Sequence, residues 1–264
     1  MPIAHRSMKL WYQSYVDDEL GGIYLDRLEA HLDALRDEHC TVDVHRLTPP
    51  DSYAHPIVEF RCARQVVKNA VQAERQGYDA FVVGHIQDSG LWEARAVVDI
   101  PVLGLGESVF LHACTLGMNI GVVTINPRFI PGFYHQIRKY ALENRVTGVH
   151  AMRFESDFQP GDFMRGFESP ETYEAVKAAF IRQAQPLVAG GVEVIIPGGG
   201  IPMLLFSEEN NFNVDGAPVV NGIPILLKAA EMAVQLRRLN GTTISRTADF
   251  AKPPPEVIQE FLDN

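Results

Sequence analysis

The sequence contains no apolar run close to the roughly 20 residues that a membrane-spanning helix needs. Its N-terminus also lacks the charged, apolar and small-residue succession of a secretory signal peptide. Basic residues are in short supply, since 23 Lys and Arg stand against 33 Asp and Glu and leave a net charge of −10. A nucleic-acid surface usually needs a basic patch, so neither nucleic acid nor a membrane is an expected partner. We expect a cytoplasmic protein that binds a small molecule.

Cysteine is scarce as well, and the three that occur, Cys40, Cys62 and Cys114, are irregularly spaced. Neither a disulfide framework nor a CxxC metal site fits that spacing, and Cys62 and Cys114 fall on helix-like patterns that favour buried structural thiols. The nine histidines are scattered and form no HxxxH or HExxH motif. The sequence therefore predicts no metal site.

The remaining pattern is one of strands that alternate with helices over 264 residues, of which 46% are hydrophobic. Strand-like segments at 8–16 and 41–47 alternate with helix-like segments at about 22–38 and 57–76. A third strand leads into a short helix, and a fourth strand follows near 100–108. This alternation predicts an α/β fold with parallel sheets.

The pattern then begins again, which indicates two related units. NIGVVTINP at 119–127 matches KLWYQSYVD, GVEVIIPGGG at 191–200 matches GYDAFVVGHI, and GIPILLKAAEMA at 222–233 matches DIPVLGLGESVF. We predict two similar parallel-sheet lobes related by a pseudo-two-fold axis. The first lobe would comprise residues 1–117 joined by 221–264, and the second residues 118–220.

In such a fold the carboxyl ends of the strands face a shared cleft, because ligands of open parallel sheets bind beyond those ends. The tips VVGHIQDSG at 82–90 and VIIPGGGIP at 194–202 would then face each other across one pocket. Two independent lobes without a shared site are the alternative.

Four segments together resemble one known family. They are GHIQDSGL at 84–91, DIPVLGLGES at 99–108 with His112 shortly after it, GVVTINPR at 121–128, and VIIPGGG at 194–200. Over nearly the whole chain up to about residue 240, the sequence resembles the aspartate/glutamate/hydantoin racemase superfamily, and most closely its hydantoin racemase branch.

The resemblance implies acid-base chemistry without a metal or an organic cofactor. In that family two cysteines, one on each tip, act as acid and base on opposite faces of a carbon next to a carbonyl. This sequence has His85 at the first of these positions and Gly199 at the second. Some relatives with a single cysteine are decarboxylases that protonate one face of an enolate, so the cleft can work with one acid-base group.

His85 is the predicted catalyst, because the unperturbed pKa of histidine lies nearest neutrality, and Asp88 could orient it. A satisfied histidine in a loop or core is the alternative. Gly198, Gly199 and Gly200 offer backbone N–H groups to a carboxylate or a developing oxyanion, although a tight turn would use glycine as well.

Further candidates for substrate binding lie at other strand ends and in the Pro-rich loop. They are Gln13, Ser14, Tyr53, Ser89 and Thr124. In the family, asparagine and serine types after the first strand hold a substrate carboxylate or carbonyl, and Gln13 and Ser14 follow that strand here. Polar residues at strand ends also cap helices, so a capping role stays open for each.

We expect an enzyme that carries out cofactor-independent acid-base chemistry next to a carbonyl of a small cyclic amide or carboxylate, with isomerase chemistry first. Hydrolysis or decarboxylation by His85 is one alternative, and a non-catalytic binding protein is another. Residues 206–218 form an acidic, Asn-rich insertion that could be a lid or an exposed connector. We expect a homo-oligomer, with the tail packed on its own domain or on a neighbouring subunit.

Overall fold

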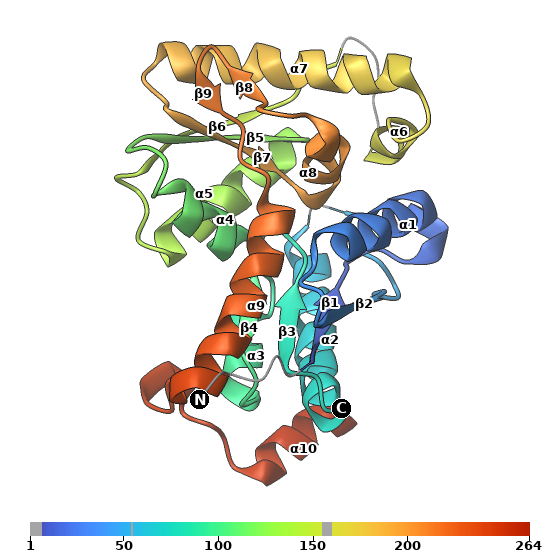
Figure 1. The fold of residues 1–264 in the computed structure, drawn as a ribbon, viewed down its shortest axis with the longest axis vertical. Coiled ribbons are helices and arrows are strands. Elements are labelled where there is room, and N and C mark those ends of the chain that lie inside the picture. The colour runs from blue at the N-terminus through green and yellow to red at the C-terminus, as the bar shows by residue number, and fades with distance from the viewer. Residues whose placement is uncertain (1–6, 54, 155–159) are drawn as a thin grey trace.

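The computed structural model describes residues 7–53, 55–154 and 160–264 (Figure 1). Strands and helices alternate along this chain, and the strands of its two larger sheets are all parallel. The α/β prediction is confirmed. Within the described part, no helix combines the length and apolar character that a membrane crossing requires.

The first sheet has four parallel strands in the order β2-β1-β3-β4. They are β1 (Met8–Gln13), β2 (Cys40–His45), β3 (Ala80–Val83) and β4 (Val102–Gly104). The helices between and after them are α1 (Asp18–Leu35), α2 (Pro56–Arg75), α3 (Leu91–Val97) and α4 (Leu105–Ala113). Every residue of β3 is buried, as expected for a central parallel strand covered by helices on both faces.

The second sheet has three parallel strands in the order β6-β5-β7. They are β5 (Ile120–Thr124), β6 (Val146–Ala151) and β7 (Val194–Gly198). The helical elements of this half are η1 (Pro127–Phe129), α5 (Ile130–Lys139), α6 (Pro160–Arg165), α7 (Pro170–Ala189), α8 (Gly200–Leu205) and η2 (Phe206–Glu208). A short antiparallel hairpin, β8 (Asn213–Val214) and β9 (Ala217–Pro218), completes it.

The two halves repeat one strand order, as the internal similarity predicts. In each sheet the first strand is central, with the second strand on one side and the third on the other. β4 then pairs with β3, and Val219 correspondingly forms a parallel bridge with Ile195 of β7. The structure therefore has two similar parallel-sheet lobes.

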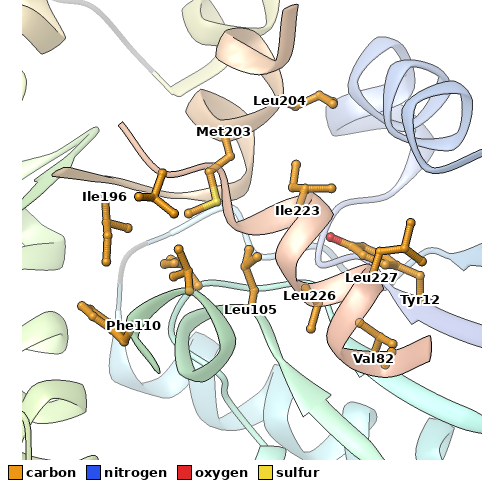
Figure 2. Close-up of a cluster of buried hydrophobic side chains, with 14 of the residues drawn as sticks. Tyr12, Val82, Leu105, Phe110, Ile196, Met203, Leu204, Ile223, Leu226 and Leu227 are labelled. Carbon is orange, nitrogen blue, oxygen red and sulfur yellow. The ribbon is translucent and has the colours of Figure 1, made fainter. Parts of the chain in front are cut away.

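The lobes share a continuous core. One cluster of buried side chains joins β1 and β3 of the first sheet to β5 and β7 of the second. Figure 2 shows Ile196 and Met203 from the second half gathered with Leu105 and Ile223. Apolar burial on this scale holds the two sheets, and hence their carboxyl ends, in a fixed relation.

Helix α9 (Gly222–Asn240) runs from the second lobe along the first sheet (Figure 1). It contacts β1, β3 and β4, and also α4 and α8. Its packing on the first sheet fits the assignment of 221–264 to the first lobe. The boundaries at 117 and 220 stay an interpretation, because the core crosses them.

The C-terminal segment packs on its own chain. After η3 (Ala248–Phe250), helix α10 (Pro255–Asp263) places Ile258 and Leu262 against the apolar cluster that includes α2 and α3. The Lys68 ammonium donates a hydrogen bond of 2.9 Å to the Leu262 carbonyl. The tail is expected to pack either on its own domain or on a neighbouring subunit, and it packs on its own domain.

Residues 206–218 are anchored to the second lobe. Phe206, Val214 and Ala217 are buried in its apolar cluster, and no residue of 206–218 lines the cavity described below. This packing favours the interpretation of residues 206–218 as a connector over their interpretation as a lid of the cavity.

Two helices begin earlier than the sequence pattern suggests. Helix α1 begins at Asp18 because the Asp17 side chain caps it by accepting a hydrogen bond from the Leu20 N–H, and Gly21 then kinks it. Helix α4 begins at Leu105, where Asp88 accepts hydrogen bonds from its first turn. Both starts depend on caps that apolar periodicity does not report.

Candidate active site

A cavity of about 530 Å³ lies where the carboxyl ends of the central strands meet. Both tips that the sequence singles out line it, with residues 84–87 after β3 and residues 198–202 at the end of β7 and the start of α8. Loop residues 51–53 and the residues Ile125, Asn126, Arg128 and Phe129 that follow β5 complete much of the wall. The cavity is thus formed by both lobes.

The β3 tip is built around a required glycine. A Cβ atom at Gly84 would lie 2.9 Å from the Gln13 carbonyl oxygen and closer still to the ring of Tyr12. Only glycine lets β3 end this close to β1, and the next residue, His85, then leaves the strand at the cavity wall.

His85 is held on two sides. Its Nε2 lies 3.2 Å from Oδ2 of Asp51, and its ring stacks on Tyr15 with centroids 4.3 Å apart. The side chain of His85 is 17% exposed and that of Asp51 is 7% exposed. Nδ1 of His85 has no hydrogen-bond partner among the described residues. One ring nitrogen is therefore bound to a carboxylate, and the other is unpaired and buried.

Burial alone would lower the pKa of His85. The hydrogen bond to Asp51 and the charges of Glu59, Asp51 and Asp88 outweigh burial and raise the pKa above 6.5. An imidazole with a raised pKa is a stronger base when neutral and stays charged to higher pH. This environment suits acid-base catalysis.

Asp51 and Glu59 were not predicted from the sequence. Asp51 lies in the Pro-rich loop, and Glu59 lies in the first turn of α2, where its carboxylate accepts a hydrogen bond from the Ser89 hydroxyl. The Tyr15 hydroxyl donates a 2.5 Å hydrogen bond to the Ser89 carbonyl. Ser89, a predicted substrate ligand, thus connects the residues around His85 and is absent from the cavity lining.

The same groups are the one candidate metal cluster within the described ranges. Potential ligand atoms of Asp51, Glu59 and His85 all lie within 4.8 Å of one another. In the structure these groups are paired, Asp51 with His85 and Glu59 with Ser89. The cluster joins residues far apart in sequence, which is why spacing motifs do not find it.

Asp88 lies elsewhere than the sequence suggests. Its fully buried carboxylate accepts hydrogen bonds from the N–H groups of Gly106 (2.9 Å) and Glu107 (2.6 Å), Nε2 of Gln136 (3.1 Å) and the Tyr140 hydroxyl (2.6 Å). Burial raises the pKa of Asp88 to about 6 although these donors oppose the rise. Asp88 ties the β3 tip to α4 and α5, and Asp51 instead makes the contact with the His85 ring.

The three glycines of the β7 tip differ from one another. A Cβ atom at Gly198 would lie 2.9 Å from Cβ of Thr124 and from the ring of Phe133, so this glycine is needed for packing. At Gly199 the backbone is extended, with φ 161°, and a Cβ atom would meet only Pro202, at 3.2 Å. The second tip therefore has room for a side chain at 199 and carries none.

The other predicted ligands divide into two groups. Ser14 and Tyr53 line the cavity. Gln13 does not, because its amide binds the carbonyls of Ser14, His45 and Arg46 and the side chains of Trp11 and Asn69. Thr124 is also outside the lining, and its hydroxyl donates to the Gly198 carbonyl at 3.0 Å. Gln13 and Thr124 thus form hydrogen bonds at the strand ends without lining the cavity.

The lining also includes residues that sequence reasoning missed, notably Tyr24, Asn126 and Arg128. Asn126 and Arg128 belong to the GVVTINPR segment, and a search for polar residues just beyond β5 would have found them. Tyr24 lies inside a helix on an apolar face, where no local signal separates it from the core.

None of the cysteines lines the cavity. Cys40 and Cys62 are buried, and burial raises the pKa of each thiol to about 12. Such thiols are weak nucleophiles at neutral pH. The predicted burial is confirmed for Cys62, whereas Cys114 is only half-buried.

Comparison with known proteins identifies the family. A profile of the Asp/Glu/hydantoin racemase family matches residues 23–230. A hydantoin racemase from Pseudomonas sp. (strain NS671) is 28% identical over 212 residues, which are 78% of this chain and 77% of the relative.

Solved structures agree at the level of the fold. An allantoin racemase from Klebsiella pneumoniae matches with a TM-score of 0.72 and 21% identity, over 94% of each chain. An allantoin racemase from Pseudomonas fluorescens matches with a TM-score of 0.72 and 22% identity, over 94% of this chain and 98% of that one. The chain belongs to the Asp/Glu/hydantoin racemase family and is an enzyme of the racemase type.

Proposed function

We propose that this member of the Asp/Glu/hydantoin racemase family moves a proton at the carbon next to a carbonyl of a small, hydantoin-like cyclic amide. His85 is the acid-base group on one face of that carbon, and the reaction needs no cofactor. The observation that carries the proposal is the His85–Asp51 pair, which lies at the cavity wall on the β3 tip with Nε2 and Oδ2 3.2 Å apart.

In this proposal neutral His85 takes the α-proton and the resulting imidazolium returns it. Asp51 binds Nε2 and stabilises the charged ring, so the proton is exchanged at Nδ1, which is unpaired but buried in the structure and must come into contact with the substrate when the substrate binds. The stacked Tyr15 ring keeps the imidazole plane fixed during transfer. A positioned group of this kind contributes about 10² to 10⁴ in rate.

The opposite face of the carbon would be served by water. Gly199 leaves space where the family resemblance puts a second cysteine, and a Cβ atom there would meet only Pro202. A water molecule in that space can donate a proton to the planar enolate, which inverts the carbon. The hydroxide that remains is then neutralised by the proton that the His85 imidazolium releases. Inversion is then slower than exchange on the His85 face, because water is a weaker acid than an imidazolium.

The alternatives left open by the sequence gain no support from the comparisons. The curated relative is a hydantoin racemase, and the family profile is that of racemases. Hydrolysis, decarboxylation and non-catalytic binding are therefore outcomes to be tested and are not part of the proposal.

The test is to incubate the purified protein in D2O with single enantiomers of 5-substituted hydantoins and of allantoin. Deuterium uptake at the α-carbon is followed by NMR, and inversion by circular dichroism. Uptake accompanied by slower inversion supports the proposal. Ring opening, loss of CO2, or binding without deuterium uptake would replace it with one of the alternatives.

A further inference from the structure

Tyr24 carries a hydroxyl group that the fold leaves unsatisfied. The residue is 4% exposed and lines the cavity, and the hydroxyl has no hydrogen-bond partner among the described residues. The Tyr24 oxygen is not among the fully buried unpaired polar atoms, so it is open to the cavity that the residue lines. A donor that has no protein partner and faces a cavity is satisfied by what enters the cavity.

The hydroxyl lies between the two tips. A Cβ atom built on Gly200 would be 2.8 Å from the Tyr24 oxygen and 3.9 Å from the carbonyl oxygen of Gly84, the residue before His85. A first-lobe side chain, carried by α1, therefore reaches the start of α8 in the second lobe. It stands next to the tip that has no side chains of its own.

Burial raises the pKa of the Tyr24 hydroxyl well above its ordinary value. The phenol therefore stays protonated across the physiological range, which makes it a poor base and a permanent hydrogen-bond donor. A preorganised donor in a water-poor site acts most strongly on charge that develops in the transition state. When an α-proton leaves, that charge develops on the carbonyl oxygen.

We infer that Tyr24 is a catalytic residue whose hydroxyl donates a hydrogen bond to the substrate carbonyl oxygen as this oxygen becomes an enolate. No covalent bond to Tyr24 forms, and the proton of the hydroxyl stays on the phenol. The inference rests on the proposed function, because it names the group that stabilises the enolate which His85 generates.

The decisive variant is Tyr24→Phe, which removes one oxygen and keeps the ring that packs near Phe167. We expect kcat for α-proton exchange to fall about 10²-fold, with KM within a few-fold, since the donor acts on the transition state. The matched control is Tyr12→Phe, because the Tyr12 hydroxyl is unpaired as well but is fully buried and does not line the cavity. It should leave kcat unchanged.

A binding readout tests the same role without turnover. Barbiturate, a planar enolate anion at neutral pH, should lose about tenfold or more in affinity to Tyr24→Phe, while neutral hydantoin loses little. Equal losses for both ligands would indicate a merely structural role and overturn the inference.

A double-mutant cycle distinguishes the loss of the Tyr24 hydroxyl from a general effect of misfolding. Gly200→Ala places a methyl group 2.8 Å from the Tyr24 oxygen and should slow the wild-type enzyme by displacing the hydroxyl. In the Tyr24→Phe background the same change should have much less effect, because the hydroxyl is already gone. Additive effects would overturn the inference.

The outcomes separate the two proposals. No exchange by the wild-type protein with any cyclic amide defeats the proposed function. Normal exchange by the wild type with undiminished exchange by Tyr24→Phe defeats the role of Tyr24 alone.

Discussion

The β3 and β7 tips occupy equivalent places in two similar sheets, yet they are chemically opposite. The β3 tip carries His85, whose ring is bound by Asp51 and stacked on Tyr15. The β7 tip carries glycines and presents only backbone to the cavity at 198–200. A duplicated fold can therefore keep its cleft while the side-chain chemistry concentrates on one half.

The difference between the tips lies in their support as well as in their identity. Behind His85 stand a carboxylate, an aromatic ring and the Glu59–Ser89 hydrogen bond. At the second tip, the Thr124 hydroxyl donates to the Gly198 carbonyl, and a Cβ atom at Gly199 would meet only Pro202. The first tip holds a fixed imidazole, as the proposed proton transfer requires, and the second offers space.

The largest effect is expected at the first tip. His85→Asn keeps the size of the side chain and removes the titratable proton, so exchange should fall by about 10² or more with ligand affinity within a few-fold. The control is His112→Asn, since His112 lies in α4 outside the cavity lining. Rates are measured by deuterium uptake. A lower melting temperature with an undiminished rate would make His85 structural.

The second prediction concerns the support behind the first tip. Asp51→Asn removes the largest factor that raises the pKa of His85, so the ionisation that controls exchange should move to lower pH. We also expect an approximately tenfold loss of rate at the optimum, because the imidazolium loses its partner. Complete pH–rate profiles of both proteins check this, and an unmoved profile would contradict it.

The His85–Asp51 pair should also make the free energy of unfolding depend on pH. Because the folded-state pKa of His85 is raised above the unfolded value, the stabilisation is full below about pH 6.5 and is lost as pH rises through the folded-state pKa. The difference in melting temperature between wild type and Asp51→Asn should therefore be larger at acidic than at alkaline pH.

The third prediction concerns a variant that makes the two tips more alike. Gly199→Cys should fold, since the backbone is extended there and a Cβ atom meets only Pro202, and it should raise inversion relative to exchange about tenfold. Gly198→Cys is the matched control, because its Cβ atom would press on Thr124 and Phe133. We expect that control to be destabilised by about 1–3 kcal/mol. An unchanged ratio in Gly199→Cys would show that the empty face does not limit inversion.

The smallest effect is expected from reagents that act on thiols or metals. Alkylation should leave activity intact, because no cysteine lines the cavity and the pKa values of Cys40 and Cys62 are raised to about 12. Dialysis against EDTA should likewise change nothing. Loss of activity that is restored by a divalent cation would instead make Asp51, Glu59 and His85 a metal site.

The sequence predicted the parallel lobes and both tips because these depend on local signals, namely buried strands, helix periodicity and terminal glycines. It could not predict Asp51 as the partner of His85, because the contact joins a Pro-rich loop to a strand end through the folded backbone. Asp88 is nearer in sequence, but its left-handed backbone, with φ 54°, and the donors of α4 and α5 draw its carboxylate away. Tyr24 shares its apolar spacing with core residues, and only the cavity distinguishes it.

The most direct test of the asymmetry between the tips is deuterium uptake measured separately for the two enantiomers of one exchanged hydantoin, alongside inversion. The enantiomer whose α-proton faces His85 should gain deuterium several-fold faster than it inverts, and this excess should disappear in His85→Asn. Equal exchange and inversion for both enantiomers would mean two equivalent acid-base groups and would contradict the asymmetry between the tips.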